Sequence, residues 1–474
     1  MKLKNNLKKY YFSEKIYIWE WILASLILLL VMVSYCYVDT RSLTIWSTNV
    51  WDVIFDGKPL EFWSYTAQNL HGVPHKIMAN DLISILPLSF WNFPIWIAQR
   101  FFHYEINQNW ILMNWSKLGL VAFLIATSYM GYKICLKLTN DKHRSIWAAY
   151  LTFSCSLCIN GVAFAGQNDI FFIFFSVIGI YFLIDEKKWR FIIFSAISIA
   201  IKPFFIFVFF PLVLLVEKNI LKIIANSLGA VSLYAINKVV FSIFPFYTES
   251  LSSGPSQRVL VNMFKIALPS SKIPFSMFLL GWLIICYLAY VTIPKDKQEN
   301  NAFVIYVPTA IYLLQCCLSD IEHYRMLMVM PFLAIILMMN FNKFRLNAFM
   351  YAVFQFCACA TNAIHSRYFL APKYIKGTMF NFLFGTPDKK LQYKNIPSFL
   401  FKSNESIVTF IKYPVAAALL FSALLLVVIN YPRYKRHSDL EQTGLFAKYD
   451  HGLLVLNTIV ILPFVMLSFI LFLK

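Results

Sequence analysis

Charged side chains are scarce in this sequence of 474 residues. They make up 14% of the chain, whereas hydrophobic residues make up 59%. A composition this apolar excludes an ordinary soluble domain. Apolar runs of the length that a bilayer requires recur from end to end, and helices are the only way to satisfy the backbone of so many runs in lipid. The sequence therefore predicts an all-α polytopic membrane protein, folded as a single integral membrane domain.

Signals of several other classes are also missing. No internal repeat is evident, which argues against an inverted-repeat transporter. No small-residue cleavage site follows the first apolar run, so we expect a retained first span with the N-terminus in the cytoplasm. His323 and His365 lack metal-ligand spacing, and the nine cysteines lie in or at the ends of apolar runs. We therefore expect no metal site and no disulfide framework in the outer loops.

The net charge of +19 comes from lysines and arginines that sit mainly in short loops between the apolar runs. Membrane topology and anionic lipid explain such a distribution, so we expect a lipid bilayer and no nucleic acid as partner. The lysine- and asparagine-rich composition favours a multi-pass protein of a bacterial plasma membrane.

Short apolar runs and one long run decide the predicted number of crossings. The Phe191–Val216 run would measure about 39 Å as one helix at roughly 1.5 Å per residue, which is long for one crossing and too short for two. Two short helices meeting at Lys202-Pro203 give about thirteen crossings in all by span length. A single crossing there would move every later loop to the other side, and the basic residues do not decide between the two. The predicted spans are approximately Ile16–Val38, Trp110–Leu136, Ile146–Asn160, Ile170–Ile184, Phe191–Val216, Leu221–Phe244, Pro274–Ile293, Phe303–Leu318, Met326–Met339, Leu346–Ala360, Val408–Ile429 and Leu453–Phe472.

Two longer hydrophilic regions interrupt the apolar runs. Residues 39–109 form a long first extracytoplasmic loop that is rich in tryptophan and proline. Within it, Asp81 to Phe102 could lie in the membrane plane or re-enter the membrane, and a full span is the alternative. Residues 361–407 form a later extracytoplasmic segment that we expect to cap the bundle.

Two polar interruptions stand out inside otherwise apolar sequence. One holds Gln167, Asn168 and Asp169, and the other is Lys202. Ionisable residues at membrane depth usually mark a functional site. The basic turn at residues 185–190 lies between them, which places Asp169 and Lys202 on the same side of the membrane. Helix capping at Ile170 is an alternative explanation for Asn168 and Asp169, whereas Lys202 at the rim of a cavity suits the phosphate of a lipid-linked substrate.

Acids near the end of the first span are candidates for acid–base chemistry. Asp39 directly follows the first span, and Asp52 lies further along the same loop. A carboxylate held against a low-dielectric wall can act as a general base toward an acceptor hydroxyl. Solvated loop residues are the alternative interpretation of both acids.

A third polar group lies between two later spans, at residues 319–325. Its Glu322, His323 and Arg325 could hold sugar hydroxyls or a phosphate. A plain polar turn explains the same residues equally well.

Together these features resemble the glycosyltransferase C superfold. The likeness is carried by an early acid in a long first loop, by short spans bearing residues 166–169, and by Lys202-Pro203. Residues 56–60 are also similar to an acid-Gly-x-Pro-Leu segment of polyprenyl-phosphate-mannose-dependent mannosyltransferases and related bacterial envelope glycosyltransferases. The sequence departs from that pattern where those relatives carry the catalytic aspartate, because the position falls at Leu43. If the alignment shifts, Asp39 fills the role, and Asp52 is the second choice.

The resemblance implies an inverting, metal-independent transfer of a hexose from a polyprenyl-phosphate donor. The acceptor would be a cell-envelope glycan, lipid or protein, the active site would be extracytoplasmic, and no cofactor beyond the lipid-linked co-substrate is implied. Two alternatives stay open, namely a transporter or flippase for a lipid-linked glycan and a non-catalytic membrane subunit. The implied roles are Asp39 or Asp52 as the base, Lys202 on the donor phosphate, Gln167, Asn168 and Asp169 along the cavity, and Glu322, His323 and Arg325 on sugar or phosphate.

Overall fold

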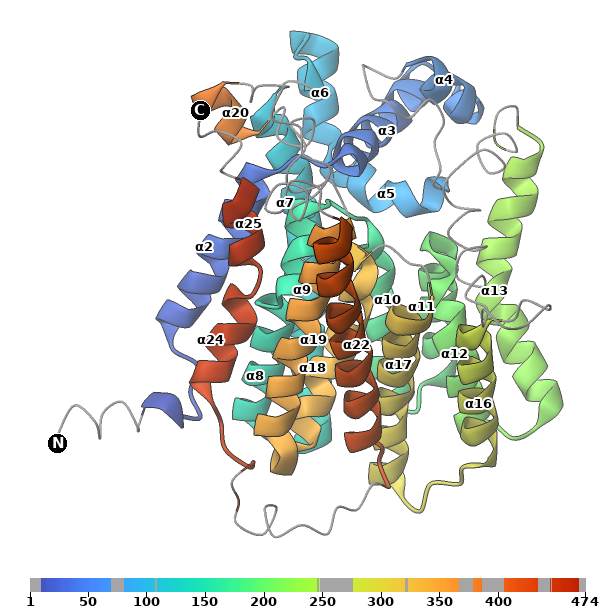
Figure 1. Cartoon of the computed structure of the whole chain (residues 1–474). Coiled ribbons are helices and arrows are strands. Elements are labelled where there is room, and N and C mark those ends of the chain that lie inside the picture. Colours follow the sequence, from blue (N-terminus) through green and yellow to red (C-terminus); the bar gives the residue numbers. More distant parts are fainter. Residues whose placement is uncertain are drawn as a thin grey trace.

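The computed structural model of the chain describes residues 10–69, 81–106, 109–244, 247, 276–319, 323–365, 378–385, 405–433, 444 and 446–468. All regular secondary structure in these ranges is helical. Long helices stand side by side in a bundle, and a smaller outer group lies over one end of it (Figure 1). The bundle holds α2 (Ile18–Ser34), α7 (Trp110–Thr139), α8 (Lys142–Phe153), α9 (Ser156–Ile159), η3 (Asn160–Phe164), α10 (Asp169–Ile184), α11 (Lys188–Ile201), η4 (Pro203–Phe205), α12 (Ile206–Val216), α13 (Ile220–Ser242), α16 (Met277–Val291), α17 (Lys297–Leu318), η5 (His323–Val329), α18 (Met330–Met339), η6 (Phe341–Lys343), α19 (Phe344–His365), α22 (Glu405–Ile429), α24 (His451–Ile459) and α25 (Leu462–Ser468). The outer group holds α3 (Val38–Phe55), η1 (Pro59–Glu61), α4 (Phe62–Gln68), α5 (Leu82–Trp91), α6 (Phe93–Phe102) and α20 (Met379–Phe384).

Length and composition identify a membrane-embedded helical protein. The described residues contain 5 helices that are long and apolar enough to cross a membrane, or up to 8 if each bent helix pair is one span. Shorter apolar helices, among them α10 and α12, lie between them. In lipid a helix satisfies its own backbone hydrogen bonds, which is why apolar runs of this length fold in this way.

The Phe191–Val216 run folds as two short helices, as predicted. α11 ends at Ile201 because Lys202 is extended (φ −150°, ψ 132°) and Pro203 has no backbone N–H to continue the helix. α12 then returns to the end from which α11 began, since Lys188 Nζ lies 3.5 Å from Glu217 Oε2. The turn between the two helices therefore stands at the end of the bundle that carries the outer group.

The segment expected as the first loop is largely helical. α3 follows α2 after a break at residues 35–37 and bends from it by 81°, so Asp39 lies in the first turn of a helix. The segment from Asp81 to Phe102 forms α5 and α6, which bend by 71° at their joint, so it is not one straight span. Of the expected cap at residues 361–407, residues 366–377 and 386–404 lie outside the described residues.

A buried lysine of α7 fixes the point where α2 ends. Lys117 is fully buried, and its ammonium donates to the carbonyl oxygen of Met32 at 2.8 Å and to that of Tyr35. The last carbonyls of a helix have no partner within the helix, and a basic side chain can satisfy them. The hydroxyl of Thr44 in α3 donates a hydrogen bond of 2.8 Å to the hydroxyl oxygen of the neighbouring Ser116. α7 thus sets both the end of α2 and the position of α3.

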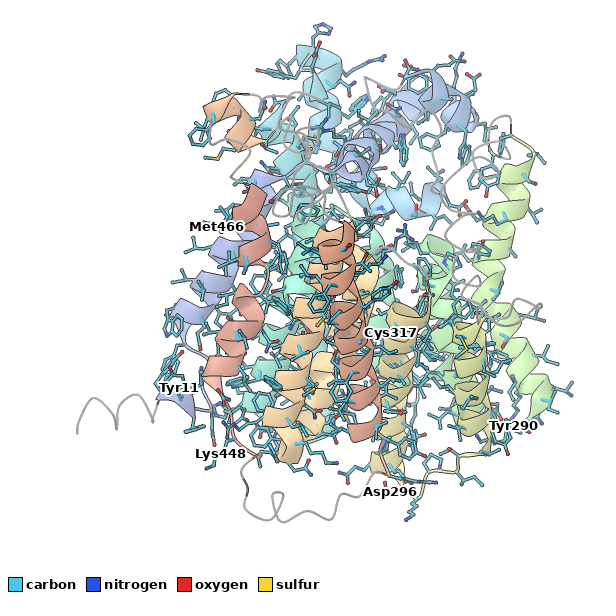
Figure 2. All side chains as sticks on the ribbon, in the orientation of Figure 1. Tyr11, Tyr290, Asp296, Cys317, Lys448 and Met466 are labelled. Atoms are coloured by element: carbon cyan, nitrogen blue, oxygen red, sulfur yellow. The ribbon has the colours of Figure 1, made fainter. Side chains whose placement is uncertain are left out.

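Ion pairs tie the loops together at the opposite end of the bundle. Lys297 Nζ lies 2.6 Å from Glu186 Oε1, and Arg433 Nε lies 2.6 Å from Glu299 Oε1. Figure 2 places Asp296 at this same end, away from the outer helices. Lys297 and Arg433 therefore lie at the end that does not carry the site described below.

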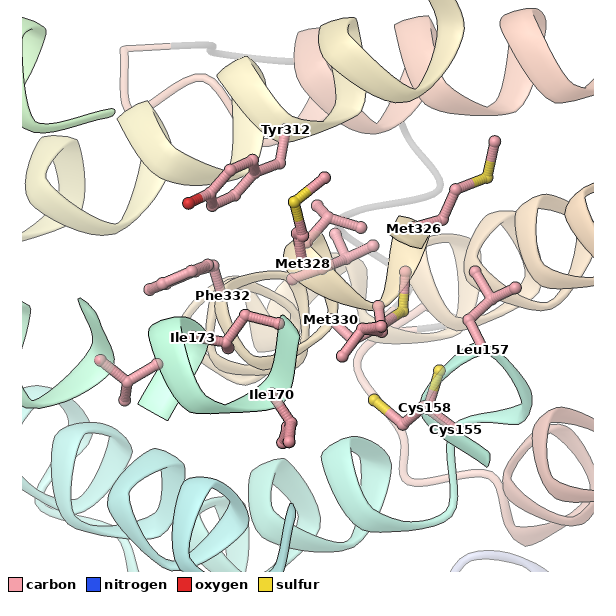
Figure 3. Packing of buried hydrophobic residues seen from close by; sticks show 14 of the residues in the cluster. Cys155, Leu157, Cys158, Ile170, Ile173, Tyr312, Met326, Met328, Met330 and Phe332 are labelled. Atoms are coloured by element: carbon pink, nitrogen blue, oxygen red, sulfur yellow. The ribbon is translucent and has the colours of Figure 1, made fainter. Parts of the chain in front are cut away.

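Sulfur-containing side chains fill the middle of the bundle between α9 and the segment η5–α18 (Figure 3). Cys155 and Cys158 face this region together with methionines at positions 326, 328 and 330, which adapt easily to irregular gaps. Gln355 of α19 accepts hydrogen bonds from Ser156 N at 2.8 Å and Cys155 Sγ at 3.1 Å, so it satisfies the backbone where α8 gives way to α9. Within the described ranges, no group of three or more His, Cys, Asp or Glu residues is arranged to hold a metal ion.

Candidate functional site

The site is built on an ion pair between two helix ends. Asp169 is the first residue of α10, and Lys202 is the C-cap of α11. The Lys202 ammonium contacts Asp169 Oδ1, and both residues are buried. A helix N-terminus favours an anion and a C-terminus favours a cation, so each charge stands where its own helix stabilises it. The two residues predicted to share one side of the membrane are thus in direct contact.

Arg325 brings a second cation to the same carboxylate. Its Nε lies 4.0 Å from Asp169 Oδ2, and its guanidinium is 5.7 Å from the ring centroid of Phe204. An aromatic face attracts a cation and holds the planar guanidinium in place. One carboxylate therefore lies between two cations, and the three side chains together carry a net positive charge.

Asp39 joins this group from the outer helices. Gln167 Nε2 donates a hydrogen bond of 2.7 Å to Asp39 Oδ2, and the Asp39 carboxylate interacts electrostatically with Lys202. The next residue, Thr40, donates from its hydroxyl to the carbonyl oxygen of Ala165 at 3.3 Å. The first turn of α3 thus packs against the turn that precedes α10.

Gly166 permits this close approach. Its φ is +60°, and a Cβ at this position would lie 2.0 Å from the hydroxyl oxygen of Thr40. Glycine is the residue that adopts such a conformation without steric cost and leaves room for a neighbouring chain. The motif at residues 166–169 therefore needs its glycine for packing against α3.

Helix capping does not account for the polar side chains of this turn. Asn168 occupies the N-cap position of α10, but its side chain makes no capping hydrogen bond. Its Nδ2 instead donates to the carbonyl oxygen of Ser84 in α5, at 3.2 Å. The Asp169 carboxylate is likewise used for Lys202. The turn connects the bundle with two helices of the outer group, α3 and α5.

Asp52 belongs to a different cluster. Trp96 Nε1 donates to Asp52 Oδ1 at 2.8 Å, and Arg100 Nη1 lies 3.8 Å from the same oxygen. Burial, together with the nearby Asp52 carboxylate, raises the pKa of Tyr65 to about 12. Along α3, Asp52 lies about 20 Å from Asp39 at roughly 1.5 Å per residue. The two candidate bases therefore cannot serve one site, and the group around Lys202 includes Asp39.

The remaining predicted residues are placed only in part. Glu322 lies outside the described residues, and His323 begins η5 without a described side chain. Two tyrosines that the sequence analysis did not single out are neighbours of site residues in sequence, Tyr37 of Asp39 and Tyr324 of Arg325, and their rings are 5.9 Å apart. The only sequence signal for Tyr324 is its position beside Arg325.

This arrangement combines two chemical capabilities. Asp39 is a carboxylate that can accept a proton, and the amide of Gln167 donates a hydrogen bond to it. Lys202 and Arg325 supply positive charge at the same end of the bundle, where fixed cations stabilise an oxyanion more strongly than they would in water. The geometry suits a reaction in which a hydroxyl loses a proton while negative charge develops on a phosphate.

Comparisons with known proteins do not identify this chain. No family model, no curated protein and no solved structure matches it. A fold by itself does not specify an activity, so the chemistry of the site is what bears on the function of this chain.

Proposed function

We propose that this chain is a membrane glycosyltransferase that moves a hexose or similar sugar from a polyprenyl-phosphate donor to a cell-envelope glycan, lipid or protein. The observation that carries the proposal is the Asp39 carboxylate, held by Gln167 beside the Asp169–Lys202–Arg325 group. A base next to fixed cations is what such a transfer requires.

In the proposed reaction, Asp39 takes the proton of the acceptor hydroxyl. The hydroxyl oxygen forms a bond to the anomeric carbon from the face opposite the leaving group, which inverts the configuration. The bond between the anomeric carbon and the phosphate oxygen breaks, and the lipid phosphate leaves with the electron pair. Lys202 and Arg325 stabilise the charge on that phosphate, and Asp169 holds both cations in place. The step needs no metal.

The proposal includes thirteen crossings of a bacterial plasma membrane, with the N-terminus in the cytoplasm and the site outside. Lys137, Lys188 and Lys218 support this orientation, because all three lie at the end of the bundle away from the site. α10 has 16 residues and α12 has 11, fewer than the about 20 that a full crossing needs. Their site ends would therefore be recessed below the membrane surface, where a lipid phosphate and a water-borne acceptor can meet.

Sugar transfer in liposomes tests the proposal. Purified protein would receive radiolabelled polyprenyl-phosphate hexoses and a mixture of envelope acceptors, and transfer by the wild type with loss in Asp39→Asn is the expected result. If the wild type transfers from no donor but moves a lipid-linked glycan across the bilayer, the protein is a flippase and the proposal is wrong. If it does neither while binding envelope proteins, it is a non-catalytic subunit.

A further inference from the structure

α10 has one helix face that the rest of the bundle does not bury. The side chains on this face are partly exposed and recur at helical spacing, whereas the other side chains of α10 are buried; they are Phe174, Phe175, Ile178, Tyr181 and Phe182. α7 and α11 flank α10. In a membrane-embedded protein such a face is open to lipid.

Aromatic rings from all three helices meet on this face. The ring of Phe123 in α7 lies 5.3 Å from that of Phe174. The ring of Phe194 in α11 lies 6.4 Å from that of Phe175 and 5.4 Å from that of Phe182. These five phenylalanines, called the aromatic face below, form a continuous apolar surface across α7, α10 and α11.

Two lysines of α7 lie where the aromatic face ends, at the end of α10 opposite the site. Lys137 Nζ lies 5.4 Å from the ring centroid of Tyr181 and pairs with Asp185. Lys133 stands one turn earlier on α7, and its Nζ lies 5.3 Å from the ring centroid of Tyr129. Among the described residues, Lys133 has no carboxylate partner.

Arg190 adds a cation from the α11 side. Its guanidinium lies 5.2 Å from the ring centroid of Phe182 and 5.0 Å from that of Trp189, which is 60% exposed. The rings of Phe182 and Tyr181 are 5.6 Å apart, so the Arg190 and Lys137 contacts adjoin each other. Arg190 likewise pairs with no carboxylate in the described part of the chain.

The carboxylates at this end already have lysine partners. The pairs are Asp185 with Lys137 and Lys187, Glu217 with Lys188, and Glu186 with Lys297. Lys133 and Arg190 therefore keep their positive charge unmatched beside an apolar, lipid-facing surface. A group that complements both features carries a negative charge and apolar chains together.

We propose that this surface selectively binds anionic phospholipid from the leaflet at the end of the bundle opposite the site. The headgroup phosphates bind Lys133 and Arg190, and the acyl chains lie on the aromatic face. Lysine binds phosphate as a point charge and arginine binds it through two parallel N–H groups. Basic sites between membrane helices bind such headgroups, and exposed tyrosine and tryptophan rings prefer the same depth. The inference is independent of the proposed sugar transfer.

The test titrates the purified full-length protein in neutral detergent with phosphatidylglycerol or with phosphatidylcholine that has the same acyl chains. Bound lipid is counted by native mass spectrometry, and Tm is followed in parallel. Phosphatidylglycerol is expected to bind more tightly and to raise Tm further, because a ligand of the folded state stabilises that state.

The double variant Lys133→Met with Arg190→Met keeps the apolar stems and removes both charges. Its affinity for phosphatidylglycerol should fall roughly thirtyfold, which is about fivefold for each charge, while phosphatidylcholine binds as before. Each single variant should lose about fivefold, which keeps the test open if the double variant does not fold.

A matched control removes two charges from the same end of the bundle without touching this surface. Lys297 and Arg433 pair with Glu186 and Glu299, so Lys297→Met with Arg433→Met makes the same change in net charge. This control should keep the wild-type preference for phosphatidylglycerol.

Three results would overturn the inference. The first is an unchanged preference for phosphatidylglycerol in the double variant. The second is an equal loss in the control variant, which would show general attraction by net charge. The third is a rise in Tm with inorganic phosphate that equals the rise with phosphatidylglycerol at the same concentration, which would show a site for a free anion that makes no use of the acyl chains.

Discussion

Replacing Asp39 by asparagine isolates the proton-accepting role from the packing role. The side chain of asparagine has the same shape, and its carbonyl oxygen can still accept the 2.7 Å hydrogen bond from Gln167 Nε2. The packing of α3 against the turn before α10 is also kept, because it depends on Thr40 and Gly166. Loss of activity in Asp39→Asn would therefore reflect chemistry and not a displaced helix.

The expected effect is large. A positioned general base contributes typically 10²–10⁴-fold to a rate, which corresponds to about 3–5 kcal/mol of activation free energy at roughly 1.4 kcal/mol per tenfold. Asp39→Asn should lower kcat by such a factor. The KM for the lipid donor should change little, since Lys202 and Arg325 remain in place to bind the phosphate.

Asp52→Asn is the matched control. Asp52 lies about 20 Å further along α3, and its hydrogen bond from Trp96 Nε1 can persist to the asparagine oxygen. We expect near wild-type transfer from this variant and a small loss of stability from the weakened contact with Arg100. The assay is initial-rate transfer of radiolabelled sugar in liposomes, with protein content and orientation measured for each variant.

Two results would refute this reasoning. Asp39→Asn with a rate within a few-fold of the wild type would remove Asp39 as the base. Loss of transfer in Asp52→Asn alone, with normal folding, would keep the enzyme and assign the base to the cluster around Trp96 and Arg100.

Three further predictions concern stability and are checked by thermal or denaturant unfolding in detergent. Lys202→Met removes the closer of the two cations that pair with the buried Asp169 carboxylate and leaves only Arg325 at 4.0 Å, so it should cost about 3–5 kcal/mol; the double variant with Asp169→Leu should recover part of this, and additive losses would contradict the pairing. Gly166→Ala should lower the stability clearly more than Gly57→Ala, because both glycines have positive φ but only at Gly166 does an added Cβ collide with α3. Gly57→Ala should cost about 1–2 kcal/mol of stability. Equal losses for the two variants would show that the collision is relieved. Lys117→Met keeps the apolar stem but removes the donor to two carbonyls of α2 and should cost about 1–3 kcal/mol; an unchanged midpoint would show that the bend after α2 does not depend on it.

The sequence alone determined the class of protein and the local breaks in its helices. Hydropathy is read along the chain, and a bilayer imposes its length on every span, so apolar runs predict helices without knowledge of their neighbours. The reversal at Lys202-Pro203 was predictable for the same reason, because run length and a proline without N–H are local properties. The shared side of Asp169 and Lys202 followed from the basic turn between them.

Only the tertiary structure separated Asp39 from Asp52. Both are acids of the same segment, and residue type cannot tell which of them meets Lys202. The choice depends on α3 being a helix, which spaces the two acids far apart, and on a contact between Thr40 and Ala165 across 125 positions of sequence. The charge balance of the site likewise depends on Arg325 approaching from a distant segment.

Such contacts form between two segments that are distant in sequence. Their stabilising free energy therefore cannot be predicted from the sequence of either segment alone. Lys117 shows this most clearly, since in sequence it is one lysine inside an apolar run. Its ammonium acquires a role only because the packing of α7 against α2 brings it to the carbonyl oxygens of Met32 and Tyr35. Periodicity and composition place such a residue in the bundle, whereas packing decides what it faces.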